Sequence, residues 1–193
     1  MLKQAPRSRH LGCAIVNGTG YGTQRGFTLP ELMAVVAITG VLATLATYGV
    51  RKYVLAAKQA EATSMLTQIR AAEEAYLDET FSYRGGGDFD TWHPTKTPDS
   101  GKRNWRFGDN AMTAVLDDLA IQPNGPVYYS YAVVAGTAGS TVPDIPGAQA
   151  YRIPAPTGPY YIAMAMADLN GDGTYTYALT WSGSSEIWVD LTF

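Results

Sequence analysis

Residues 27–50, FTLPELMAVVAITGVLATLATYGV, decide the fold of this chain, and they contain a single charged residue, Glu31. As an α-helix this stretch is roughly 36 Å long at ~1.5 Å per residue, which exceeds the ~30 Å hydrocarbon core of a bilayer. Basic residues flank it on both sides, Arg25 before and Arg51-Lys52 after. The pattern predicts one membrane-spanning helix with the preceding segment in the cytoplasm.

The segment before this helix, residues 1–26, is a basic leader. It carries four basic residues and no acidic one. All 17 acidic residues of the chain come later, against ten basic ones, so the remainder has a net charge of about −7. A basic leader before an apolar run is typical of targeting. The acidic remainder argues against nucleic acid as a partner.

Cysteine use restricts how the remainder is stabilised. Cys13, in the leader, is the only cysteine of the sequence. Residues 27–193 therefore form no disulfide, and packing, strand pairing or a metal must hold them together.

The helix is expected to continue beyond the apolar run. Apolar residues recur there at steps of three and four, and no glycine or proline falls between Val50 and Tyr83. The sequence predicts one helix from Phe27 to about Phe81. The predicted stripe consists of Val54, Leu55, Ala62, Met65, Leu66, Ile69, Ala72, Tyr76 and Leu77, whereas Lys58, Glu61, Gln68, Arg70 and Glu74 are expected to face elsewhere.

Residues 84–126 read as an irregular connection that opens on Gly85-Gly86-Gly87, with a short helix at 110–119 and Asn110 as its N-cap. The rest reads as strands, at 127–135, 160–167, 174–181 and 186–191, the last three forming an antiparallel meander. In the second strand, large side chains alternate with Tyr161 and three alanines.

The octet Arg25-Gly26-Phe27-Thr28-Leu29-Pro30-Glu31-Leu32 resembles the cleavage and methylation signature of type IV prepilins, the precursors of type IV pilins and pseudopilins. The position of the octet is informative, because a secretory signal peptide is cleaved after its apolar run and not before it. A weaker resemblance extends to Tyr83, about a third of the chain.

The resemblance implies an α+β pilin fold, in which the C-terminal half of the long helix (about 27–81) packs on an antiparallel sheet of about four strands and its first half protrudes. It divides the chain into a removed cytoplasmic leader at 1–26, a transmembrane and filament-core helix at 27–50, an amphipathic helix at 51–83, an αβ loop at 84–126 and a β-sheet region at 127–193.

The resemblance also assigns roles to three residues. A prepilin peptidase would cut between Gly26 and Phe27 and methylate the new amino terminus of Phe27. Glu31 would pair with that positive amine, on a neighbouring subunit or the same one, and set the register of assembly. The alternative for Glu31 is an acid favoured by the helix dipole at the first turn.

Two positions depart from the usual family pattern, and two glycines mark weak points of the helix. Pro30 stands where an aliphatic residue is common, and a first helical turn tolerates it. Tyr48 replaces a proline that kinks the helix in many major pilins. Gly40 and Gly49 either weaken the helix or allow close helix packing in the membrane.

The expected function is that of a structural subunit of a type IV pilus-like filament, serving adhesion, twitching or DNA uptake, and not that of an enzyme. The alternative is a pseudopilin of a type II secretion system, and a distant one is a membrane-anchored binding domain that does not polymerise. The implied partners are identical or related pilin subunits, the prepilin peptidase, the inner-membrane assembly platform and, before assembly, the bacterial inner membrane. The mature subunit is then expected in a cell-surface filament, or in the periplasm for a pseudopilin.

A second, weaker motif lies at Asp168-Leu169-Asn170-Gly171-Asp172-Gly173, which resembles the first half of a calcium-binding loop. No cofactor is expected to be required, but Ca²⁺ at Asp168, Asn170 and Asp172 is a possible ligand, with Glu186 or Asp190 completing its shell. The other interpretation is a plain hairpin turn. Surface positions are expected for His93 and for the pairs Glu73-Glu74 and Asp117-Asp118.

Overall fold

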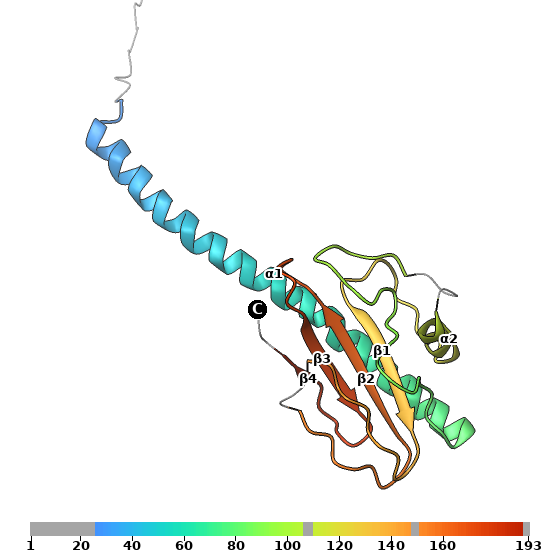
Figure 1. The fold of residues 1–193 in the computed structure, drawn as a ribbon. Helices are drawn as coiled ribbons and strands as arrows, with labels where there is room; N and C mark the ends of the chain where they lie inside the picture. The colour runs from blue at the N-terminus through green and yellow to red at the C-terminus, as the bar shows by residue number, and fades with distance from the viewer. Residues whose placement is uncertain (1–25, 106–109, 148–150, 191–193) are drawn as a thin grey trace, which may run out of the picture. The chain divides into compact units, whose positions relative to one another are not determined.

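A computed structural model describes residues 26–105, 110–147 and 151–190. The elements, labelled in Figure 1, are α1 (Leu29–Thr80), α2 (Ala111–Asp118), β1 (Ser130–Gly136), β2 (Tyr160–Ala167), β3 (Thr176–Trp181) and β4 (Trp188–Val189). This is the α+β arrangement expected from the sequence. The residues up to Leu45 and those from Ala46 onward form two compact units.

Helix α1 confirms the prediction of one long helix to within two residues at each end. It begins at Leu29 and ends at Thr80, after which Phe81 adopts a left-handed conformation with φ of 59°. The N–H of Phe81 still donates to the carbonyl of Leu77 at 2.8 Å. Helical hydrogen bonding therefore stops within one residue of the change in backbone conformation.

The four strands form one antiparallel sheet in the order β1-β2-β3-β4, so the whole sheet is a meander. Three strands are shorter than predicted. β1 starts at Ser130, because Val127 pairs with Arg103 in an isolated bridge instead. β3 starts at Thr176, and the pairing of β4 covers only Trp188 and Val189.

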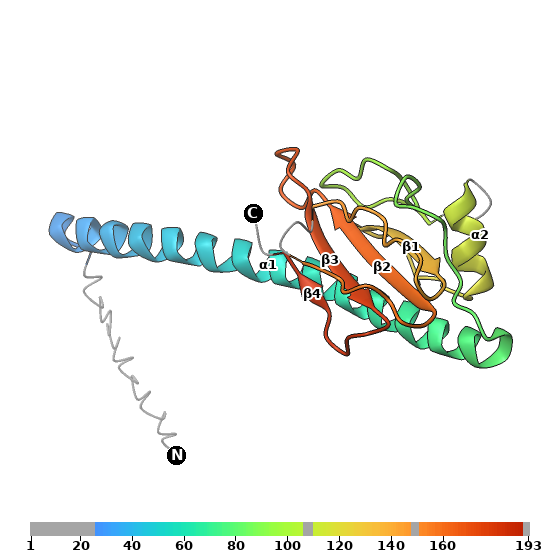
Figure 2. The same cartoon turned by 60° about the horizontal axis from the view of Figure 1, so that its bottom comes forward.

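The C-terminal part of α1 lies along one face of this sheet, as Figure 2 shows. Arg70 of α1 donates to the Thr180 hydroxyl of β3 at 2.5 Å. Strand partners share a face and alternate residues return to it, so Ala163, Ala165 and Ala178 lie on the Thr180 face. Ala167, which pairs with Thr176, lies on the same face, so all three alanines that alternate with large residues in β2 face the helix side of the sheet.

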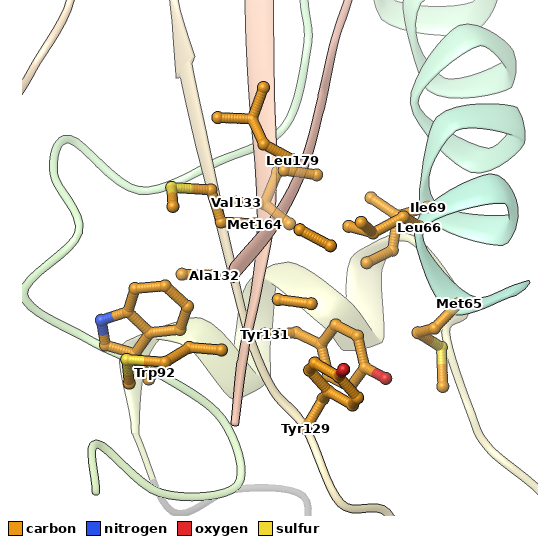
Figure 3. Close-up of a cluster of buried hydrophobic side chains, with 14 of the residues drawn as sticks. Met65, Leu66, Ile69, Trp92, Tyr129, Tyr131, Ala132, Val133, Met164 and Leu179 are labelled. Atoms are coloured by element: carbon orange, nitrogen blue, oxygen red, sulfur yellow. The ribbon is translucent and has the colours of Figure 1, made fainter. Parts of the chain in front are cut away.

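The core forms where this helix face meets the sheet. Figure 3 shows Met65, Leu66 and Ile69 of α1 directed toward Tyr129 and Tyr131. All five side chains are buried, with exposures of 4% or less. Part of the predicted outer face of α1 also contributes contacts: Lys58 donates to the Leu169 carbonyl, and Glu61 accepts from the backbone N–H groups of Tyr128 and Tyr129. Lys58, Glu61 and Arg70 lie off the buried stripe, as expected, but the sequence did not predict their hydrogen bonds to the rest of the domain.

The outer edge of β1 is covered by the connection that follows α1. Gly86, His93 and Arg103 form isolated bridges with Val134, Tyr131 and Val127. These contacts pair backbone groups that an edge strand otherwise leaves open to another chain.

Helix α2 confirms the predicted short helix and its cap. The Asn110 side chain accepts from the Thr113 N–H at 3.0 Å, and the Thr113 hydroxyl accepts from the Asn110 N–H. Asp117 and Asp118 are exposed, as expected, and Asp118 accepts from Arg84 at 2.7 Å.

Two surface expectations were wrong. His93 has no exposed surface: its Nδ1 lies 3.0 Å from the Thr113 hydroxyl and its ring packs edge-on against Trp105. Glu73 is also fully buried, whereas its neighbour Glu74 is exposed. Both errors arise because burial of a polar residue depends on partners from other segments, here Arg84 for Glu73 and Thr113 for His93, which local sequence does not reveal.

Candidate processing and assembly site

The Gly26–Phe27 peptide bond lies in a short non-helical segment ahead of α1. The Phe27 side chain is 78% exposed, and a Cβ added to Gly26 would meet nothing within 4 Å. A protease needs an accessible peptide in extended form, and glycine offers the least steric resistance to it. In the part of the chain that the structure describes, the Gly26–Phe27 bond is therefore accessible to an enzyme.

Glu31 folds back onto the residue that precedes the helix. Its Oε2 accepts two hydrogen bonds from Thr28, one from the backbone N–H and one from the hydroxyl, each 2.7 Å long. Thr28 in turn accepts from the N–H of Leu32 at 3.2 Å. This is the glutamate half of a capping box, in which the third helical residue binds the N–H of the cap. Among the hydrogen bonds of the described segments, none involves Oε1, so one carboxylate oxygen remains available.

Thr28 is the functional neighbour that sequence reasoning missed. The spacing Thr28-x-x-Glu31 is itself the capping-box signature, and it precedes an apolar run. The signal was therefore present in the sequence. The dipole interpretation of Glu31 and the assembly interpretation are compatible, because the cap uses only one oxygen.

The first part of α1 exposes a nearly continuous apolar surface. By length and composition α1 could cross a membrane, and none of its most apolar window is buried. Gly40 and Gly49 lie in this part, the helix continues through both, and a Cβ on either would meet nothing within 4 Å. The large exposed side chains from Phe27 to Val50 are Phe27, Leu29, Leu32, Met33, Val35, Val36, Ile38, Val41, Leu42, Leu45, Tyr48 and Val50.

The candidate calcium loop lies between β2 and β3. Both carboxylate oxygens of Asp168 accept backbone N–H groups, from Gly171 at 2.7 Å and Gly173 at 3.0 Å. Asp172 accepts from the Thr174 N–H at 2.7 Å and from the Asn170 side chain at 2.9 Å. These bonds account for the turn by itself, while each oxygen retains a second lone pair for a cation.

The additional ligands suggested for this loop differ in their position. Asp190 donates its N–H to the Tyr177 carbonyl, at the end of the sheet where the loop enters β3. Glu186 lies near Trp181, at the opposite end of β3, because Trp188 pairs with Leu179. Of these two residues only Asp190 lies at the correct end of the sheet. The part of the chain that the structure describes contains no group of three or more His, Cys, Asp or Glu side chains that could hold a metal.

Comparison with known proteins gave a match to a family profile and a match to a pilin. A family profile described as the prokaryotic N-terminal methylation motif matches residues 22–47. The type IV major pilin protein PilA of Myxococcus xanthus (strain DK1622) is 42% identical over 59 residues.

This chain is similar to type IV pilins over part of its length. The alignment with PilA covers 31% of the pilin-like chain and 27% of the relative, so the chain spans about a quarter of the length of that pilin. No solved structure matches. The profile match at residues 22–47 includes Gly26, Phe27 and Glu31.

Proposed function

We propose that this pilin-like protein is a structural subunit of a type IV pilus-like filament, matured by cleavage between Gly26 and Phe27 and N-methylation of Phe27. The observation that carries the proposal is the exposed apolar surface at the start of α1, most of which lies within the methylation-motif match at residues 22–47. Such a surface is stable only in lipid or against other apolar helices.

In this proposal the same apolar surface is buried both before and after assembly. Before assembly it spans the inner membrane with the leader in the cytoplasm, where the prepilin peptidase cuts. After cleavage, an assembly platform transfers the helix from lipid to a bundle of identical or related helices, and the sheet-bearing unit forms the outside of a cell-surface filament.

In this proposal Glu31 sets the register in which the helix joins the bundle. A carboxylate in an apolar bundle is costly unless it is paired. Thr28 satisfies Oε2, and cleavage creates a positive amine at Phe27 that suits Oε1. Cleavage therefore prepares the partner that Glu31 needs, on a neighbouring subunit or on its own.

The test compares Glu31→Ala with the wild-type protein in a host that has a prepilin peptidase and an assembly system. Glu31→Ala is expected to be cleaved normally but to give no sheared filaments. Glu186→Ala, which removes an exposed acid of the other compact unit, is the matched control and should assemble. Wild-type amounts of filament in Glu31→Ala would refute the assembly role. An intact leader on protein recovered from filaments would refute the maturation.

A pseudopilin of a type II secretion system is the second candidate. The residues after the leader contain no cysteine, and the Asp168 loop offers an alternative brace by calcium. If the chain is such a pseudopilin, deleting the secretion ATPase would abolish the chain's role in secretion, whereas deleting the pilus ATPase would not. The reverse result favours the pilus.

A further inference from the structure

We propose that the C-terminal end of α1 in one copy docks on residues 48–54 of α1 in a second copy, so that acidic and aromatic side chains meet basic and aromatic ones. The proposal rests on the proposed filament function and names the contact between its subunits. Two surfaces of the same chain carry it, one at each end of the second half of α1.

The first surface is acidic. Asp78 and Glu79 are exposed in the last turn of α1, which contains no basic residue. Acids at a helix C-terminus face the negative end of the helix dipole and typically cost about 0.3–1 kcal/mol each. Neither forms an ion pair with any residue that the structure describes. A partner cation from another copy would offset this cost.

Phe81 adds an apolar anchor to the acidic surface. Its side chain is 85% exposed, and its backbone is left-handed with φ of 59°. That conformation is uncommon for a bulky residue, and such outliers cluster at functional positions. The exposed ring follows Asp78 and Glu79 by three and two residues in the chain, so a partner at this end of α1 could cover it.

The second surface has the complementary chemistry. Arg51 and Lys52 are exposed and form no ion pair within the described part of the chain. Exposed aromatic rings flank them: Tyr48 is 73% exposed and Tyr53 is 77% exposed. This surface also continues the apolar stretch that the proposed filament buries helix on helix, so a second copy is already expected beside it.

The helix geometry fits two parallel copies shifted along their axes. From Lys52 to Glu79 is 27 residues, which is about 7.5 turns and about 40 Å. A half-integral number of turns places the basic and acidic residues on opposite faces of the same helix. Parallel neighbours related by a shift face each other with opposite sides, so the contact is head-to-tail and repeats without closing, as a filament requires.

Cysteine cross-linking in sheared filaments tests the contact directly, since the mature region has no native cysteine. Lys52→Cys combined with Glu79→Cys is expected to give a ladder of multimers with a short bismaleimide. Lys52→Cys combined with Gln68→Cys is the matched control. Gln68 is exposed and lies on nearly the same helix face as Glu79, but about 16 Å short of it, so this pair should remain monomeric. Filaments without a Lys52–Glu79 ladder, or an equal ladder from the control, would overturn the proposal.

Charge reversal provides an independent readout. Lys52→Glu and Glu79→Lys alone should each lower filament yield at least about tenfold, because each places like charges against each other at the interface and a loss of about 1.4 kcal/mol corresponds to a factor of ten. The double reversal should restore the yield. A double variant as poor as either single one would contradict the pairing. Failure of the wild-type protein to form filaments would instead refute the proposed function.

Discussion

The backbone N–H of Arg84 donates a 2.9 Å hydrogen bond to Oε2 of Glu73, which has no exposed surface. The other oxygen of this carboxyl, Oε1, is buried and has no hydrogen-bond partner in the described part of the chain. Arg84 also binds Asp118 of α2 through its side chain. Glu73 thus anchors the chain where it leaves α1 and turns back along β1.

This environment predicts a stability that depends on pH. Burial, with a smaller effect from Glu74, raises the pKa of Glu73 to about 8, although the Arg84 N–H opposes the shift. The folded state therefore binds more protons than the unfolded one between pH about 4.5 and 8, so stability should fall as pH rises through this window. The slope is at most about 1.4 kcal/mol per pH unit.

Glu73→Gln should remove this slope, since the amide keeps the shape without titrating. Thermal unfolding of the full chain in detergent micelles from pH 5 to 9 measures it, with Glu74→Gln as the exposed control. A slope unchanged by Glu73→Gln would show that another group is responsible.

The glycine run at 85–87 should be sensitive at one position only. A Cβ on Gly85 would overlap the backbone of Val134 and Ala135 in β1, whereas a Cβ on Gly87 would meet nothing within 4 Å. Gly85→Ala should therefore lower stability by about 1–3 kcal/mol, as overpacking does, and Gly87→Ala should leave it unchanged or slightly higher. Urea unfolding of both variants checks the difference, and equal effects would contradict the close approach.

Calcium binding at Asp168, Asn170 and Asp172 remains a prediction. A site at ten times its Kd would stabilise the fold by about 1.4 kcal/mol and raise Tm by about 3–6 °C. The increase should disappear in Asp172→Ala and with a chelator. No shift of the wild-type protein at millimolar Ca²⁺ would end the prediction.

Asp168 should matter for the loop whether or not calcium binds. Its carboxylate accepts the N–H groups of Gly171 and Gly173, so Asp168→Ala should cost about 1–3 kcal/mol even in a chelator. Thermal unfolding with EDTA measures this effect. A stability equal to the wild-type value would show that the turn does not depend on Asp168.

Thr28 should position Glu31. Thr28→Val removes the hydroxyl donor to Oε2 and leaves the backbone donor, so the first turn of α1 should fray, with amide exchange at Leu32 rising about fivefold for a loss of about 1 kcal/mol. Thr28→Ser keeps the hydroxyl and should exchange as the wild-type protein does. Equal exchange in all three proteins would show that the cap contributes nothing.

The sequence by itself determined the features that depend on neighbouring residues. The basic leader, the cleavage octet and the apolar run locate Gly26, Phe27 and Glu31. Helical periodicity predicted the amphipathic part of α1, the cap at Asn110 predicted α2, and β-forming residues between turn signals predicted the strands; the structure confirms these elements with shifts of a few residues at their ends. Local patterns suffice here because helix and strand formation depend on side-chain spacing along a single segment.

Only the tertiary structure decided which polar residues are buried and where the edge of the sheet is covered. Glu73 and His93 are enclosed because residues 84–105 return along β1, and the bridges at Gly86, His93 and Arg103 join positions that are tens of residues apart. The cost of burying a charge or an edge depends on such distant partners, and no local pattern encodes them.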